Sequence, residues 1–177
     1  MSATFSAWPN MITPALLLAG AGFLLFAALH DIVARTVPNE MSILLAVTGL
    51  GARFMDGTVV IGLAAAAAVF VVAAFLWRRG WMGGGDVKLL GASALLVPPN
   101  LVLTFIVATS IAGSLCAALY LAAGRMARAA RKPALAQIPR QTSLLARAVR
   151  AELRRMRRGG PLPYACAIAA GFLFILF

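Results

Sequence analysis

The sequence predicts an all-α, polytopic membrane protein with about six transmembrane helices and both termini on the extracytoplasmic side. Of its 177 residues, 62% are hydrophobic, whereas a soluble domain has typically ~45–50%. The mean hydropathy is +0.93. The apolar stretches are continuous rather than alternating, as in spanning helices and unlike the strands of a membrane barrel. Residues 1–177 are therefore predicted to form one membrane-embedded domain.

Apolar runs and the breaks between them define each expected helix in turn. The first run has no Lys or Arg before it and is long, so we expect a retained helix rather than a cleaved signal peptide. The second and fourth runs are short for a span. The turn Pro98-Pro99-Asn100 separates the fourth run from the fifth. The six expected segments are 12–30, 41–55, 59–77, 87–98, 101–124 and 161–177.

The distribution of basic residues predicts the orientation. Eleven of the sixteen Lys and Arg residues lie between Arg125 and Arg158, which predicts a basic cytoplasmic loop over 125–160. With the N-terminus outside, only Arg53, next to Asp56, falls in an outer turn. Within the loop, apolar residues recur at helical spacing, which predicts an amphipathic helix on the anionic cytoplasmic leaflet. Membrane lipids are therefore expected partners, and nucleic acid is not.

Two isolated acids mark a candidate site. The assigned topology puts Asp31 at the cytoplasmic end of the first helix and Asp86 at the cytoplasmic start of the fourth, so they share a membrane face. Acids at such positions are functional candidates. Two carboxylates that share a proton suffice for water-mediated amide hydrolysis, since one activates water while the other polarises the carbonyl.

Gly83, Gly84 and Gly85 stand directly before Asp86. Without Cβ atoms they would let a substrate strand lie against the backbone and would allow angles that other residues resist. In the simpler alternative, the glycines only break a helix and allow close packing, and Asp86 is an acid at a helix start.

The inventory of reactive residues excludes most other chemistries. His30 is the only histidine, so a serine triad or a histidine-rich metal site lacks parts. Cys116 and Cys166 are the only cysteines and lie in apolar segments, which provides neither a disulfide framework nor a four-thiolate zinc site. No phosphate-binding Gly-Lys-Ser/Thr motif occurs. We expect no metal and no cofactor.

Taken together, these motifs resemble the type IV prepilin peptidase family of intramembrane aspartic peptidases. Asp31 is followed by Val37-Pro38-Asn39, and the run from Met82 to Ala92 contains the family's glycine-x-glycine-aspartate element. A Pro-Tyr pair at residues 163–164 is similar to the family's final-helix signature. The resemblance implies that Asp31 and Asp86 are the catalytic pair. It also implies a set of substrate-binding or site-shaping residues: Gly83, Gly84, Gly85, Lys88, Pro38, Asn39 and Tyr164.

The same resemblance implies the substrate and its location. The chain would remove the short basic leader of a prepilin or pseudopilin precursor at the cytoplasmic face of the bacterial inner membrane. Longer members carry a cysteine-rich zinc region and also N-methylate the product. This chain lacks that region and is similar to the short, peptidase-only branch of Flp-type tight-adherence pili, although archaeal preflagellin peptidases share the two-aspartate plan. Methyltransferase activity is therefore not expected, and the oligomeric state is not indicated.

Two alternatives remain open at this point. In a small ion or proton transporter, Asp31 and Asp86 would bind or relay ions, although the sequence has no convincing internal repeat of the kind that transporters show. In a noncatalytic membrane scaffold, both acids would be structural. The scaffold predicts that removal of either carboxylate leaves function intact, whereas the peptidase requires both.

Overall fold

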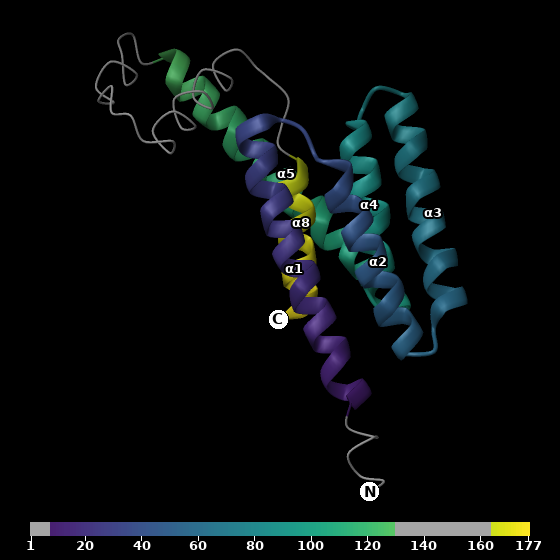
Figure 1. Ribbon diagram of the computed structural model, residues 1–177. Coiled ribbons are helices and arrows are strands. Elements are labelled where there is room, and N and C mark those ends of the chain that lie inside the picture. The colour runs from purple at the N-terminus through teal and green to yellow at the C-terminus, as the bar shows by residue number, and fades with distance from the viewer. Residues whose placement is uncertain (1–7, 130–163) are drawn as a thin grey trace, which may run out of the picture.

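The structure is a computed structural model that describes residues 8–129 and 164–177. Both ranges are helical and contain no strand, which confirms the all-α prediction for this part of the chain. The elements, shown in Figure 1, are α1 (Trp8–Ala34), α2 (Asn39–Met55), α3 (Val59–Arg78), α4 (Gly84–Leu96), the short 3-10 helix η1 (Pro99–Leu101), α5 (Val102–Ala129) and α8 (Tyr164–Leu176).

Each predicted apolar segment coincides with a helix, and α1 and α5 extend furthest beyond their predicted C-terminal ends. α1 continues past residue 30 to Ala34, so that Asp31 lies inside its last turn. α5 continues through Arg125 to Ala129 and so enters the segment predicted as a basic loop. The rest of that loop and its expected amphipathic helix lie outside the residues that the structure describes.

Within the residues that the structure describes, three helices are long and apolar enough to cross a membrane: Thr13–Ala34, Val59–Arg78 and Pro99–Met126. The chain is therefore a membrane protein. α4 and α8 have 13 residues each, which gives about 20 Å of helix against a hydrocarbon core of about 30 Å. The prediction of six complete spans, and of the side on which the termini lie, is not settled by these lengths.

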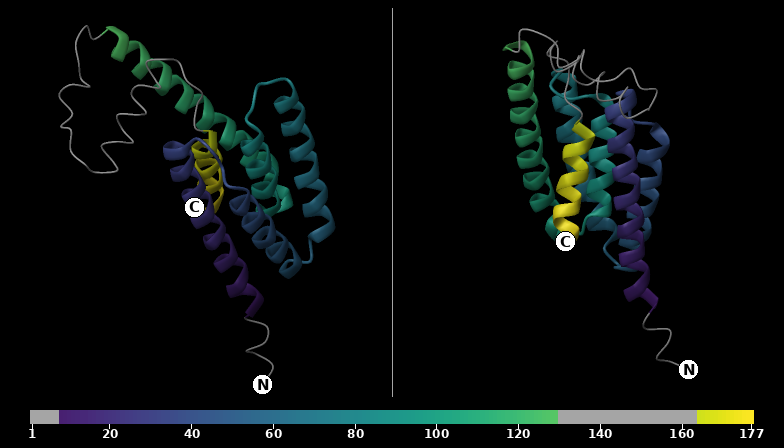
Figure 2. Two further views of the ribbon diagram at one scale, coloured as in Figure 1. Left: turned by 45° about the horizontal axis from the view of Figure 1, so that its top comes forward. Right: turned by 90° about the vertical axis from the view of Figure 1, so that its left-hand side faces the viewer.

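The helices form two groups, α2, α3 and α4 in one and α1, α5 and α8 in the other, which meet where α1 packs on α2 and α4 contacts α8. α8 lies between α1 and α5 (Figure 2), and α4 packs along α2 and α3 while also contacting α1 and α8. Small residues allow the closest approaches, as is common between membrane helices. A Cβ at Gly49 would lie 2.8 Å from the backbone nitrogen of Leu96, and one at Gly171 would lie 2.7 Å from that of Thr109. α4 is consequently the most enclosed helix among those described.

An ion pair at the end of α2 corrects the expectation that Arg53 lies in an outer turn. Arg53 does not lie in the outer turn: it belongs to the last turn of α2 and is only 1% exposed. Its guanidinium lies 3.0 Å from the Asp56 carboxylate and donates a hydrogen bond of 3.5 Å to the carbonyl of Leu96 on α4. The other Asp56 oxygen accepts one of 3.3 Å from Thr13 on α1. The partners of this buried charge therefore include the Asp56 carboxylate that follows α2 and the Leu96 carbonyl on α4.

Candidate active site

Asp31 lies in the last turn of α1 and its side chain is buried. The helix ends at Ala34 because the next residue, Arg35, has a left-handed backbone with φ 57°. The Nδ1 atom of His30 hydrogen-bonds the carbonyl of Thr36 at 2.7 Å and so closes the turn that follows. His30 thus holds the connection to α2.

Asp86 occupies the first turn of α4, immediately after the three glycines. Gly83 is the N-cap and has an extended backbone, with φ −72° and ψ 144°. Three residues later, the Asp86 carboxylate accepts a hydrogen bond from the Gly83 backbone, which resembles the return bond of a capping box. Asp86 is held by the end of its own helix.

The three glycines act through close approach rather than through unusual backbone angles. None of them has a positive φ, so the expectation of angles that other residues resist is wrong. A Cβ at Gly83 would lie 2.8 Å from Oδ2 of Asp86, while Cβ atoms at Gly84 and Gly85 would lie 3.3 Å from Trp77 and Val37, respectively. Gly83 makes room for the carboxylate, and the other two let neighbouring side chains close over the first turn.

One cavity of about 330 Å³ joins the two acids. Asp31 enters it from α1, Asp86 from α4, and Tyr164 from the start of α8. The other lining residues are Arg35, Trp81, Met82 and Gly83. The structure therefore brings the two predicted acids, Gly83 and Tyr164 into one site.

The surroundings of Asp86 favour its protonated form. Asp86 lies at the start of α4, outside the three candidate spans. Burial, and then the negative charge of Asp31, raise the pKa of Asp86 to about 6, against the lowering effect of the Gly83 hydrogen bond. Burial and the charge of Asp86 also raise the pKa of Tyr164 above its ordinary value, so its hydroxyl keeps its proton.

Arg35 and Tyr120 belong to this region, and neither was singled out from the sequence. Arg35 lines the cavity and donates a hydrogen bond of 3.3 Å to the hydroxyl of Tyr120, which is buried on α5. Arg35 was detectable, because a residue four positions after Asp31 in a continuous helix would lie on the same face one turn later. Tyr120 gave no such signal, since it stands in a long apolar helix.

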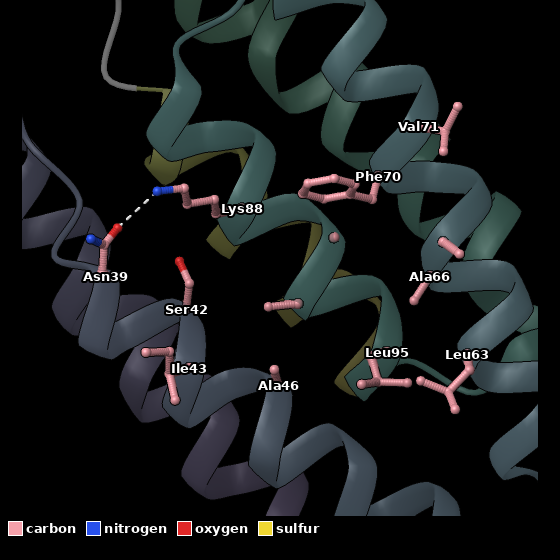
Figure 3. Close-up of a pocket in the computed structure, with 13 residues that line it drawn as sticks. Asn39, Ser42, Ile43, Ala46, Leu63, Ala66, Phe70, Val71, Lys88 and Leu95 are labelled. Carbon is pink, nitrogen blue, oxygen red and sulfur yellow. Dashed lines mark hydrogen bonds between the residues drawn. The ribbon is translucent and has the colours of Figure 1, made fainter.

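Five predicted supporting residues lie outside the cavity of the two acids: Gly84 and Gly85, described above, and Pro38, Asn39 and Lys88. Pro38 is the N-cap of α2 and marks its start. Lys88 donates a hydrogen bond of 3.0 Å to Asn39, and both line a different, larger cavity on another face of α4 (Figure 3). None of the five lines the wall around Asp31 and Asp86.

No group of three or more His, Cys, Asp or Glu side chains that could hold a metal occurs within residues 8–129 and 164–177. Both cysteines are free thiols, and the Cys166 thiol donates a hydrogen bond of 3.9 Å to the carbonyl of Ala28. Cys166 thus joins α8 to α1. The chemistry of the cavity comes from its carboxylates, tyrosine and arginine.

Comparison with known proteins identifies the family. Neither the curated protein sequences nor the solved structures give a match. The chain does match the type IV leader peptidase family over residues 18–118, which is more than half of its length and includes both Asp31 and Asp86. Members of this family are peptidases and hence hydrolases. This chain, a membrane protein with two carboxylic acids in one cavity, therefore belongs to the type IV leader peptidase family.

Proposed function

We propose that this protein is an aspartic endopeptidase of the bacterial inner membrane that removes the basic leader of a prepilin or pseudopilin at the cytoplasmic face. One observation supports the proposal above all others. Asp31 and Asp86 come from helices far apart in the sequence and line a single cavity. Two carboxyl groups in one poorly solvated cavity are the equipment of an aspartic peptidase.

The environment of each acid suggests its part in the reaction. Asp86 has the raised pKa and carries the shared proton, while Asp31 is ionised and accepts a proton from water. The water oxygen attacks the scissile carbonyl carbon as the carbonyl oxygen takes the proton of Asp86. The C–N bond then breaks: its nitrogen receives the proton held by Asp31, and the diol returns a proton to Asp86. A carboxylic acid and an amine result, and both aspartates are restored.

Two further side chains can orient the substrate. The Tyr164 hydroxyl and the Arg35 guanidinium line the same cavity, and both are hydrogen-bond donors. We propose that they hold peptide carbonyl groups on either side of the cut. The cavity is near the small end of the range of ligand sites, which is roughly 300–1,000 Å³. It therefore suits a short extended segment with small side chains better than a folded one.

The family and the cysteine content of the chain support the proposed substrate class. The sequence has two cysteines in all, too few for the four-thiolate zinc region of the bifunctional members. We therefore propose a peptidase without methyltransferase activity, which acts on Flp-type precursors.

The test is cleavage of a candidate precursor in membranes that carry the wild type, Asp31→Asn or Asp86→Asn. Glu40→Gln is the matched control, because Glu40 is an exposed carboxylate at the start of α2. Each Asn variant should lose at least about 10²-fold in rate, since general acid–base catalysis contributes roughly 10²–10⁴. The mass and the new N-terminus of the product locate the cut. Cleavage by a stable, inserted Asn variant at the wild-type rate would remove that aspartate from the mechanism.

A further inference from the structure

A cavity larger than that of the aspartates lies on another face of α4 and contains neither Asp31 nor Asp86. It has a volume of about 630 Å³ and lies between α2 and α3, with α4 as its floor (Figure 3). α2 and α3 each pack along α4 but make few contacts with one another, so the space between them is an open groove. Phe70 on α3 closes part of the floor, lying over Gly91, where a Cβ would come within 2.9 Å of its ring.

This groove is on the side of α4 that faces away from the cavity of Asp31 and Asp86. Asp86 and Lys88 are two residues apart, which places them about 200° apart around the helix. Lys88, Gly91 and Leu95 line the groove, whereas Asp86 lines the cavity with Asp31. The body of α4 therefore separates the groove from the carboxylates, and a peptide in the groove would not reach them.

The polar and apolar parts of the groove are segregated. Asn39, Ser42 and Lys88 stand at one end, near the starts of α2 and α4, and all other lining residues are apolar (Figure 3). The Lys88 ammonium uses one donor on Asn39 at 3.0 Å and has two further N–H donors. Lys88 is exposed at the membrane face that also carries the starts of α2 and α4. The groove thus has a cation at its polar end and an apolar lining along the rest of its length.

The dimensions match one leaflet of a bilayer. From Phe70 to Leu63 the apolar wall on α3 covers seven residue steps, which is about 10 Å of helix. Half of the hydrocarbon core is about 15 Å. An extended acyl chain could therefore lie along most of the groove while its headgroup stays at the level of Lys88.

From this arrangement we infer that the groove binds an anionic phospholipid, with one acyl chain between α2 and α3 and the phosphate on Lys88. Charge decides against the other occupants. A precursor with a basic leader would bring positive charge against Lys88. A second copy that docked its apolar surface here would bury the ammonium without an acid, which is costly in a membrane. An anion with an apolar tail matches both the cation at one end of the groove and the apolar residues along the rest of it. The inference stands independently of the proposed peptidase activity.

Two variants, each with a matched control, test the two parts of the inference: the phosphate on Lys88 and the acyl chain in the groove. Lys88→Gln removes the cation, and Arg125→Gln removes an exposed cation on α5 outside the groove. Ala46→Phe fills the groove from α2, and Ala64→Phe adds the same ring to an exposed position of α3 that does not line it. All four are purified at full length in detergent and checked for helix content and monodispersity.

Headgroup selectivity is measured by native mass spectrometry of protein equilibrated with phosphatidylglycerol and phosphatidylcholine of identical chains. One lysine near a bound phosphate is expected to favour the anionic lipid by about fivefold. Wild type, Arg125→Gln and Ala64→Phe should show this preference, and Lys88→Gln should lose it. An unchanged lipid ratio in Lys88→Gln overturns the assignment of the phosphate.

Acyl-chain placement is measured with a phosphatidylglycerol that carries a photoreactive group on its chain. Crosslinks should concentrate on groove residues such as Ile43, Phe70 and Leu95, should fall severalfold in Ala46→Phe, and should persist in Ala64→Phe. Crosslinks spread evenly over the lipid-facing side of α3, or unchanged in Ala46→Phe, overturn the groove as a lipid site. A crosslink from the groove to a second copy of the chain would do the same. If Lys88→Gln does not fold, the Ala46→Phe pair still decides.

Discussion

Replacement of Asp56 by Asn should destabilise the protein more than the loss of any surface acid, because it leaves a buried guanidinium without its counter-charge. The ion pair spans 3.0 Å, with Arg53 1% exposed and the Asp56 side chain 33% exposed. At an effective dielectric constant of 20, two unit charges at that distance attract by roughly 5–6 kcal/mol. Solvent at the Asp56 side chain weakens this attraction, and Asn keeps a hydrogen bond to Arg53. We expect a loss of about 2–3 kcal/mol in the free energy of unfolding.

The assay uses the two native thiols. Cys116 and Cys166 are half-buried, so a thiol-reactive fluorogenic dye reports the exposure of α5 and α8 as the protein is heated in detergent. Glu40→Gln is the control, with an expected change within about 0.5 kcal/mol. Arg53→Met should cost less than Asp56→Asn, because the acid that it leaves behind is partly solvated. The double variant should recover much of the loss.

A specific result would refute this reasoning. If Asp56→Asn shifts the midpoint no more than Glu40→Gln does, the pair does not stabilise the fold, and Arg53 reaches solvent more readily than its burial indicates. If Arg53→Met is instead the worse of the two, the hydrogen bond to the Leu96 carbonyl matters more than the charge.

Three further predictions concern the cavity of the two acids. The second-order rate constant kcat/KM should fall about tenfold per pH unit above pH 6. The pKa of Asp86 is raised to about 6, so its catalytic proton is lost as the pH rises through that value. A flat profile to pH 8 in proteoliposomes would contradict this. Tyr120→Phe removes the 3.3 Å hydrogen bond to Arg35 and should lower kcat by roughly tenfold without moving the pH profile; an unchanged kcat would show that Arg35 needs no such support. Gly83→Ala would place a Cβ 2.8 Å from the Asp86 carboxylate and should lower cleavage at least severalfold, whereas Gly22→Ala, where a Cβ meets nothing within 4 Å, should cleave normally.

Most of the fold was predictable because apolar runs both define membrane helices and are visible in one dimension. The helix ends were less so. α1 reaches Ala34 because no residue after Asp31 interrupts it until Arg35 takes a left-handed backbone. Arg53 looked solvated beside Asp56 and Gly57. Its burial depends on the Leu96 carbonyl of α4 and on the space that Gly62 of α3 leaves for its side chain, which no linear pattern contains.

The pairing of the acids was predictable, since the predicted topology ends one helix at Asp31 and begins another at Asp86 at the same end of the bundle, and the two acids do line one cavity. The residues around the two acids were predicted less accurately. Lys88 was grouped with Asp86 because the family resemblance implies a supporting role, yet helical periodicity turns it towards the opposite groove with Asn39. Tyr120 enters only when α5 packs near the end of α1, a contact between residues 85 positions apart.

The glycine run before Asp86 reconciles two demands that oppose each other. A helix N-terminus stabilises a carboxylate, and the Gly83 hydrogen bond does so as well, yet the pKa of Asp86 is raised because burial and Asp31 outweigh both. Burial at the first turn of a helix requires neighbours close to the backbone. Trp77 and Val37 approach at distances that a side chain at Gly84 or Gly85 would obstruct. Gly83 meanwhile leaves space for the carboxylate itself. The glycines therefore matter less for backbone freedom than for the exclusion of water from the Asp86 carboxyl group. Water at this turn would return the pKa of Asp86 towards its ordinary value and remove the proton that the proposed mechanism needs.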